Sequence, residues 1–151
     1  GWGTPHWDPN ARGLLIGLTR NTNRKHIARP ALEGIALSVA NLVDLAEESL
    51  NQPLRQLAVD GGAAASNPLL QAQANSTGLK IFRPKSLEST ARGVALLAGV
   101  QAGVIPDLKE LVTEGQEKAD IFLPKINTAK RTQLKSKWSN AVTRSLHWYE
   151  K

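Results

Sequence analysis

Apolar positions recur at helical spacing in two long segments, residues 24–51 and 128–149. Asn23 precedes the first segment and is a good helix cap, and Pro53 follows its end. Pro30 falls in the second turn, where it removes one backbone hydrogen bond and is expected to kink the helix. Both segments are predicted helices, and the first is predicted to pack one apolar face on a flat surface through Ile27, Ala31, Ile35, Val39, Leu42 and Leu45.

Short apolar runs that stop at turn-forming residues predict three strands, at residues 14–19, 56–59 and 79–83. Shorter helices are predicted over residues 68–76, 86–103 and 107–112, the first with Asn67 as its cap, Pro68 as its first residue and Gly78 as its stop. A charged linker over residues 113–125 contains the apolar island Ile121-Phe122-Leu123. Strands separated by helices favour an α/β fold, here a small mixed sheet covered by helices.

Length and composition narrow the class of protein. With 151 residues, 41% of them hydrophobic, the chain can bury one sizeable core. It has no run of about 18 apolar residues and no signal-peptide pattern, so no membrane partner is expected. The lack of cysteine excludes disulfides and thiolate metal sites and fits a cytoplasmic protein. A chain without methionine that opens at Gly1 is expected to be a fragment, with removal of an initiator methionine as the alternative.

The net charge of +6 makes nucleic acid a class of partner to consider. The basic residues are spread along the chain, however, and their densest run lies in the last predicted helix. That helix has an apolar face, so its lysines are expected to line the solvated side and no nucleic-acid partner is expected. The basic run is Lys130, Arg131, Lys135 and Lys137, and the apolar face is Leu134, Trp138, Ala141, Val142 and Ser145.

A glycine-rich turn after the second predicted strand is the main candidate for chemistry. Asp60-Gly61-Gly62 ends the strand and a helix begins soon afterwards, so backbone N–H groups there can approach a ligand such as a nucleotide. Asp60 either positions a ligand hydroxyl or metal-bound water, or braces the turn by bonding nearby amides; the bracing hypothesis is favoured. The chain has no Walker loop, and His6, His26 and His147 lack metal-ligand spacing.

Several motifs stand in a fixed order over nearly the whole chain. GTPHWDPNARG at residues 3–13 is followed by GLTR at 17–20, ALEGIA at 31–36, VDGGAAA at 59–65 and ESTARGVALLAG at 88–99. Together with Trp138 and Trp148 near the end, they resemble the C-terminal domain of glycerol kinases in the FGGY carbohydrate kinase family. In this resemblance VDGGAAA corresponds to the family's adenosine motif, and WDPNARG favours glycerol kinases over other sugar kinases.

The resemblance implies an ATP-dependent phosphotransferase that uses magnesium and has the actin-like, ribonuclease H-like ATPase fold. Residues 1–151 correspond to the C-terminal part of the nucleotide-binding domain, and glycerol would bind through a first domain that has no counterpart here. By the motif match, Gly61, Gly62 and Ala63 would lie against adenine and ribose, with Ser66 and Asn67 at the adenine edge. Ser66 replaces an asparagine common in the family, which shortens the donor. No catalytic residue and no metal ligand is expected in this portion.

Two other functions stay open at this point. A sister FGGY kinase would share the nucleotide site and act on a pentose or another polyol. A non-catalytic nucleotide-binding or interaction module would keep the fold without the reaction. Self-association into a homo-oligomer is also expected, because an incomplete domain exposes apolar surface or a sheet edge.

Overall fold

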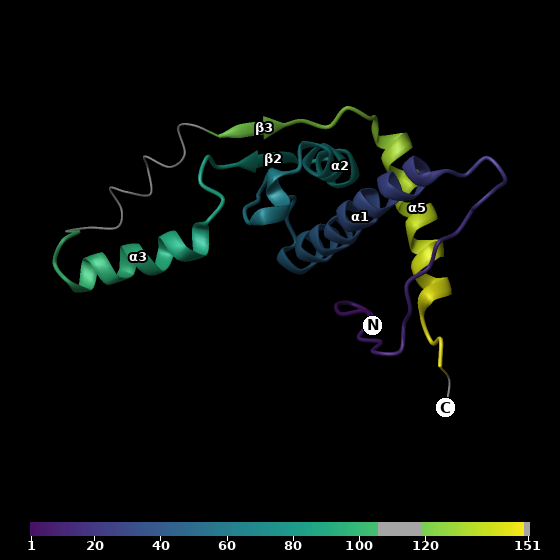
Figure 1. The fold of residues 1–151 in the computed structure, drawn as a ribbon, viewed down its shortest axis with the longest axis horizontal. Helices are drawn as coiled ribbons and strands as arrows, with labels where there is room; N and C mark the ends of the chain where they lie inside the picture. The colour runs from purple at the N-terminus through teal and green to yellow at the C-terminus, as the bar shows by residue number, and fades with distance from the viewer. Residues whose placement is uncertain (106–118, 150–151) are drawn as a thin grey trace.

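The protein is a mixed α/β structure in a computed structural model that describes residues 1–105 and 119–149 (Figure 1). The described elements are α1 (Arg24–Leu50), β1 (Gln56–Ala58), the 3-10 helix η1 (Gly62–Ala65), α2 (Asn67–Thr77), β2 (Lys80–Arg83), α3 (Ser89–Gln101), β3 (Asp120–Phe122) and α5 (Thr128–Ser145). The sheet order is β1-β2-β3, with β1 parallel and β3 antiparallel to β2. The helix predicted over residues 107–112 lies outside the described residues.

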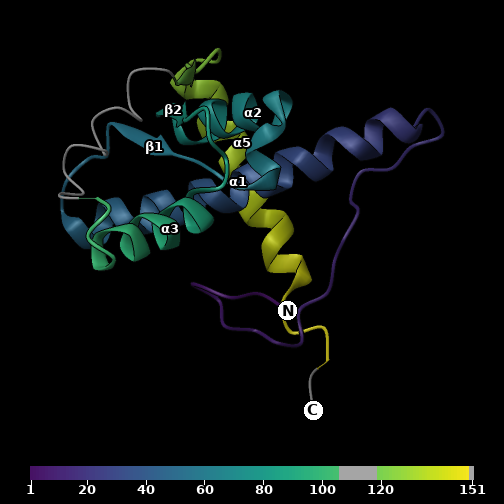
Figure 2. The same cartoon turned by 60° about the vertical axis from the view of Figure 1, so that its left-hand side comes forward.

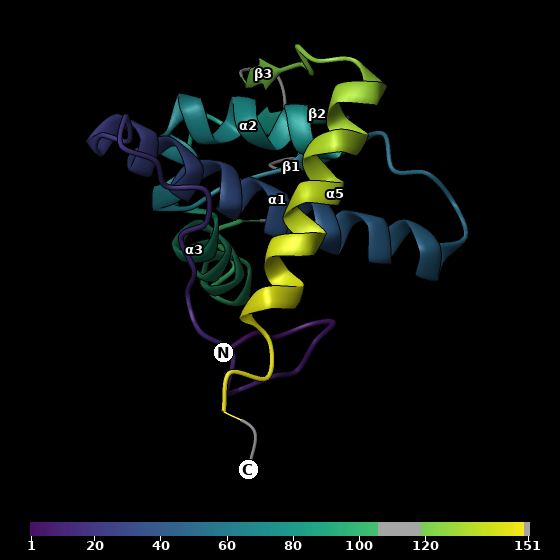
Figure 3. The same ribbon diagram turned by 90° about the vertical axis from the view of Figure 1, so that its right-hand side faces the viewer.

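A small core forms where α2 covers the central strand. Ile81 of β2 is fully buried, and its partners across the sheet are Leu57 and Phe122. Leu70 and Ala74 of α2 and Ala64 of η1 complete the buried cluster. The other side of α2 contacts α1, so α2 lies between the sheet and the long helix (Figure 3). The core therefore anchors the elements that flank the turn between β1 and α2.

The strand predicted at residues 14–19 is wrong, and β3 takes its place in the sheet. Residues 14–19 form no ladder with any described strand, and Gly17 has a positive φ of 88° that breaks an extended run. A strand needs a partner for its backbone groups, which local hydrophobicity cannot reveal. The apolar island of the predicted linker has that partner, because Ile121 and Phe122 pair with β2. Both changes come from long-range pairing.

The long helix α1 forms as predicted, but its buried face is different. The Asn23 side chain accepts a hydrogen bond from the Lys25 N–H at 3.0 Å and caps the helix, which continues through Pro30. Asn51, in the left-handed conformation, ends it before Pro53 is reached. The buried residues are Ala36, Ala40 and Val43, whereas Ile27, Ile35 and Leu42 of the predicted face are 42–51% exposed.

Small side chains explain this choice of face. Ala36 and Ala40 let the backbones of α1 and α2 come close enough for the Ser76 hydroxyl to donate to the Ala36 carbonyl at 3.0 Å. A face of leucine and isoleucine would hold the two helices apart, because their interaxial distance depends on the side chains at the contact. Hydrophobicity alone therefore pointed to the wrong side of the helix.

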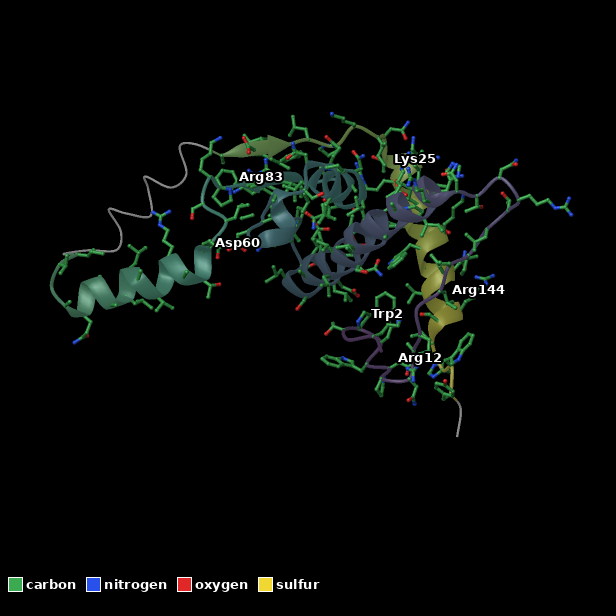
Figure 4. The ribbon with its side chains drawn as sticks, viewed as in Figure 1. Trp2, Arg12, Lys25, Asp60, Arg83 and Arg144 are labelled. Atoms are coloured by element: carbon green, nitrogen blue, oxygen red, sulfur yellow. The ribbon has the colours of Figure 1, made fainter. Side chains whose placement is uncertain are left out.

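The final helix forms as predicted at its start and carries the N-terminal loop at its end. Asn127 caps α5, which ends at Ser145 and not at Tyr149. The Trp2 indole N–H donates to the Ser145 hydroxyl at 2.7 Å, and the Arg12 N–H donates to the Ser145 carbonyl at 3.1 Å. Figure 4 shows Trp2 and Arg12 beside this end of α5. The N-terminal loop is thus attached to α5.

Helix α3 has no buried side chain and stands to one side of the other elements (Figures 1 and 2). Val94 is 65% exposed and Leu97 62% exposed, so its apolar side chains face outward from the described part of the chain. Among the described helices, none is long and apolar enough to cross a lipid bilayer.

Candidate functional site

The glycine-rich turn begins where the backbone hydrogen bonds between β1 and β2 end. The Val59 N–H donates to the Phe82 carbonyl at 3.0 Å, one residue beyond the strand. Gly61 then adopts a φ of 81°, which side chains with a Cβ rarely allow, and its N–H donates to the Leu87 carbonyl at 2.9 Å. The chain therefore leaves the sheet in a fixed direction at Gly61.

The helix η1 follows directly and begins with two exposed residues. Gly62 and Ala63 are exposed, and they occupy the first turn, where a helix supplies no acceptor for its N–H groups. A Cβ placed on Gly62 would meet no described atom within 4 Å. Its φ is not in the positive range either, so neither backbone conformation nor internal packing requires glycine at this position.

Ser66 and Asn67 were predicted at the edge of the same site, with Asn67 as the cap of the helix that follows. In the structure this helix begins one residue earlier than predicted. Ser66, and not Asn67, caps α2, because its hydroxyl accepts from the Leu69 N–H at 3.4 Å. Asn67 becomes the first residue of the helix and is exposed. Between Gly61 and Asn67 the exposed residues are Gly62, Ala63, Ala65 and Asn67, whereas Ala64 is buried in the core. The Ser66 hydroxyl contributes to the helix.

The bracing hypothesis for Asp60 is not supported. Within residues 1–105 and 119–149, the Asp60 carboxylate makes no hydrogen bond or ion pair, and the side chain is exposed at the end of the strand (Figure 4). Backbone bonds hold the turn in its place, from Gly61 to Leu87 and from Ala64 to Gly61.

Arg83 is the part of this site that sequence reasoning missed. Its Nη1 donates to the carbonyls of Ala64 at 2.9 Å and Ala65 at 3.3 Å, in the last turn of η1. Its Nε and Nη2 donate to Asp120 Oδ2 at 3.2 and 2.7 Å, and the guanidinium lies 5.3 Å from the centre of the Phe122 ring. Since Asp120 and Phe122 belong to β3, which was predicted as linker, no sequence signal joined these residues.

The acidic partner of Arg83 is held in its charged form. The Arg83 hydrogen bond, and next the charge of Lys85 at 3.6 Å, lower the pKa of Asp120 from its ordinary value. The ionised carboxylate keeps the guanidinium oriented, so its other edge stays directed at η1.

The histidines and cavities lie elsewhere. No group of three potential metal-ligating side chains comes together in the described part of the chain. His26 Nδ1 accepts from the Asn23 N–H at 3.3 Å and completes the cap of α1, which gives it a structural role. Cavities of about 560 and 660 Å3 lie along α1, and the first is lined by Trp138, whose buried indole N–H has no described partner.

Comparison with known proteins places this turn in a family. A model of the C-terminal domain of the FGGY family of carbohydrate kinases matches residues 1–102, which include the whole turn. The chain belongs to this FGGY family. It is 42% identical over 148 residues to a glycerol kinase of Saccharolobus islandicus and 44% identical over 148 residues to one of Trichlorobacter lovleyi. The resemblance seen in the sequence motifs is confirmed.

Solved FGGY structures agree with the fold described above. A glycerol kinase of Plasmodium falciparum, crystallised with ADP, has a TM-score of 0.82 at 31% identity and covers 98% of this chain. A ligand-bound xylulose kinase from Lactobacillus acidophilus has a TM-score of 0.70 at 29% identity and covers 97%. The predicted class, part of an actin-like, ribonuclease H-like ATPase domain, is confirmed.

These relatives are much longer than the chain. The matches to the two curated glycerol kinases include 98% of this chain. They span only 29% of the Saccharolobus protein and 30% of the Trichlorobacter protein. The same holds for the two structures, of which it covers 29% and 30%.

Proposed function

We propose that the chain is the C-terminal, adenosine-binding part of a glycerol kinase. The parent protein would transfer the γ-phosphoryl group of ATP to the 3-hydroxyl of glycerol, giving glycerol 3-phosphate, ADP and the released hydroxyl proton. Likeness to glycerol kinases over 98% of the chain, at 42–44% identity, supports this reaction over other FGGY chemistry.

The observation that carries the proposal is the open surface at Gly62. Nothing inside the described chain fills the space beside Gly62, so a ligand has room to approach the backbone there, in a turn that lies within the matched FGGY domain. We assign Gly61, Gly62 and Ala63 to the nucleoside face of the site, with Ser66 and Asn67 at the adenine edge. The Plasmodium relative was crystallised with ADP, which supports a nucleotide as that ligand.

The described residues show no magnesium site of their own. Phosphoryl transfer uses a divalent ion to bridge phosphate oxygens. The described residues provide no cluster of carboxylates and histidines for it, so we assign no step of the reaction to a metal held by this chain.

A matched pair of variants tests the site. Gly62→Val places a branched side chain on the proposed nucleoside face, and Gly3→Val adds the same atoms at another open glycine near the N-terminus. We expect Gly62→Val to weaken ADP binding by about tenfold or more, the scale of 1.4 kcal/mol, measured by isothermal titration calorimetry. Gly3→Val is expected to bind as the unchanged chain does. Equal affinity of the two variants would contradict the assignment.

A substrate assay and the ADP titration separate the alternative functions from this proposal. The xylulose kinase likeness makes a sister FGGY substrate the second candidate. Assay of the whole parent protein with glycerol and with xylulose separates these two, and faster phosphorylation of xylulose would replace glycerol as the substrate. A chain that binds no ADP at millimolar concentration would favour a non-catalytic module.

Two further proposals concern the surroundings of the protein. The lack of cysteine fits a reducing cytoplasm, where we place the parent enzyme. Exposed apolar side chains such as Val94 and Leu97 on α3 favour self-association of the isolated chain into a homo-oligomer. Sedimentation that shows a monomer at high concentration would count against the second proposal.

A further inference from the structure

Arg83 joins the two sides of the candidate site. It is the last residue of β2, and its side chain reaches over the end of the sheet toward η1 (Figure 4). One edge of the guanidinium donates to the carbonyls of Ala64 and Ala65, and the other donates twice to Asp120. The side chain is 14% exposed.

The bonds of Arg83 are well suited to hold a backbone turn. A guanidinium is a planar fork of donors that stays charged at all working pH values, so it can serve two acceptors at fixed angles. Its ion pair with Asp120 and its position over the Phe122 ring leave it little rotational freedom. The arginine therefore transmits the position of β3 to the peptide groups of η1.

The peptide groups that Arg83 holds belong to the same short helix as the proposed nucleoside face. Ala64 and Ala65 follow Gly62 and Ala63 directly, and Ser66 then caps α2. A 3-10 turn has poorer hydrogen-bond geometry than an α-helix, so an outside donor on its last carbonyls contributes to its order. Losing the donor leaves the partly buried carbonyl of Ala64 and the exposed carbonyl of Ala65 without this bond and loosens the turn.

We propose that Arg83 is a positioning residue for nucleotide binding, acting through the carbonyls of Ala64 and Ala65 and anchored by Asp120. This proposal rests on the assignment of η1 to the nucleoside. In it, Arg83 orders the surface on which adenine and ribose bind and does not touch the phosphates. A loss of Arg83 should therefore weaken adenosine and ADP alike.

The test compares Arg83→Gln with Lys85→Gln in the full 151-residue chain. Both variants remove one positive charge beside Asp120, but Lys85 is an exposed neighbour at 3.6 Å that makes no bond to η1. Calorimetric titration of the unchanged chain and the two variants with ADP and, separately, with adenosine gives six dissociation constants. We expect about tenfold weaker binding of both ligands in Arg83→Gln, and less than twofold change in Lys85→Gln.

Two outcomes would overturn the positioning role. Unchanged affinity in Arg83→Gln would show that η1 needs no support from this arginine. A loss confined to ADP, with adenosine unaffected, would mean direct contact with phosphate. If the unchanged chain binds neither ligand, the proposed nucleotide site itself fails, which is a distinct result.

A stability control separates positioning from general loosening. Val142→Ala removes a buried side chain of α5, away from η1, and is expected to lower the unfolding midpoint without changing the affinity for ADP. An affinity loss there as large as in Arg83→Gln would overturn the proposal. Should Arg83→Gln fail to fold, Asp120→Asn decides, because it keeps the arginine and removes the charge of its anchor; it must weaken both ligands by about threefold.

Discussion

Asp8 joins the two ends of the described chain, in addition to the Ser145 bonds to Trp2 and Arg12. Its Oδ1 accepts from the N–H groups of Asn10 at 2.8 Å and Ala11 at 3.1 Å, and its Oδ2 accepts from the N–H of His147 at 2.7 Å. His147 reaches this bond in a left-handed conformation, with a φ of 54°. The carboxylate is buried, so it connects the first loop to the end of α5 in a protected position.

The charge of Asp8 makes this junction sensitive to acid. Its pKa is lowered, first by the hydrogen bond from the His147 N–H. A folded-state pKa below the unfolded value means that the stabilisation is present above the unfolded pKa and is lost as the pH falls through the lowered one. We therefore expect the contact of Trp2 with Trp138, at 5.9 Å between ring centroids, to be lost in acid below the ordinary aspartate range.

Tryptophan fluorescence over a pH titration measures this loss. In Asp8→Asn the acid transition is expected to disappear and the melting temperature to be lower at neutral pH. Asp44→Asn, which breaks the more exposed ion pair with Lys135, serves as the control and is expected to change both properties less. An acid transition that persists in Asp8→Asn would contradict this role of the carboxylate.

At the residue scale, the sequence predicted the glycine turn because its signal is local. Gly61 has the positive φ that a glycine after a strand suggests. The support from Arg83 has no such signal, since its partner Asp120 is 37 positions away. The same limit explains why the unbonded state of Asp60 was not foreseen.

Among the elements, α2 matters most for the site, because its N-terminus lies at Ser66 and Asn67. Ser66 satisfies one of its first N–H groups, and Gly78, with a φ of 80°, ends it. Replacement of a serine cap by alanine costs about 1 kcal/mol. We expect Ser66→Ala to lower the free energy of unfolding by about that amount, and Asn67→Ala, one residue inside the helix, to lower it less. Urea unfolding measures both, and a larger effect of Asn67→Ala would contradict the cap assigned here.

Elements were predictable where local chemistry defines them and not where pairing does. Asn23 caps α1 as predicted, and α5 begins at Thr128, the predicted start of the last helix. β3 was missed because Ile121 and Phe122 become a strand only against β2. The buried face of α1 was misassigned for a related reason: close packing on α2 selected alanines over larger side chains.

For the whole molecule, the main consequence is that this chain is expected to bind nucleotide without catalysing phosphoryl transfer. Phosphoryl transfer requires the acceptor hydroxyl, the metal and the γ-phosphate in one geometry. The described residues provide the open turn at Gly61 and Gly62 and no cluster of metal-ligating groups. We expect the purified 151-residue chain to bind adenine nucleotide and to form no glycerol 3-phosphate in a coupled assay with ATP and glycerol. Detectable turnover by the chain alone would contradict this division.

Amide chemical shifts recorded during an ADP titration test whether the turn of Gly61, Gly62 and Ala63 binds the nucleotide. If the turn is the nucleotide site, the N–H signals of Gly61, Gly62 and Ala63 shift and saturate together, while those of Gly3 and Gly93 stay in place. We expect saturation at ADP concentrations up to about 10 mM, which corresponds to millimolar affinity. Saturating shifts at the cavity beside Trp138 with none at the turn, or no shifts at all, would contradict it.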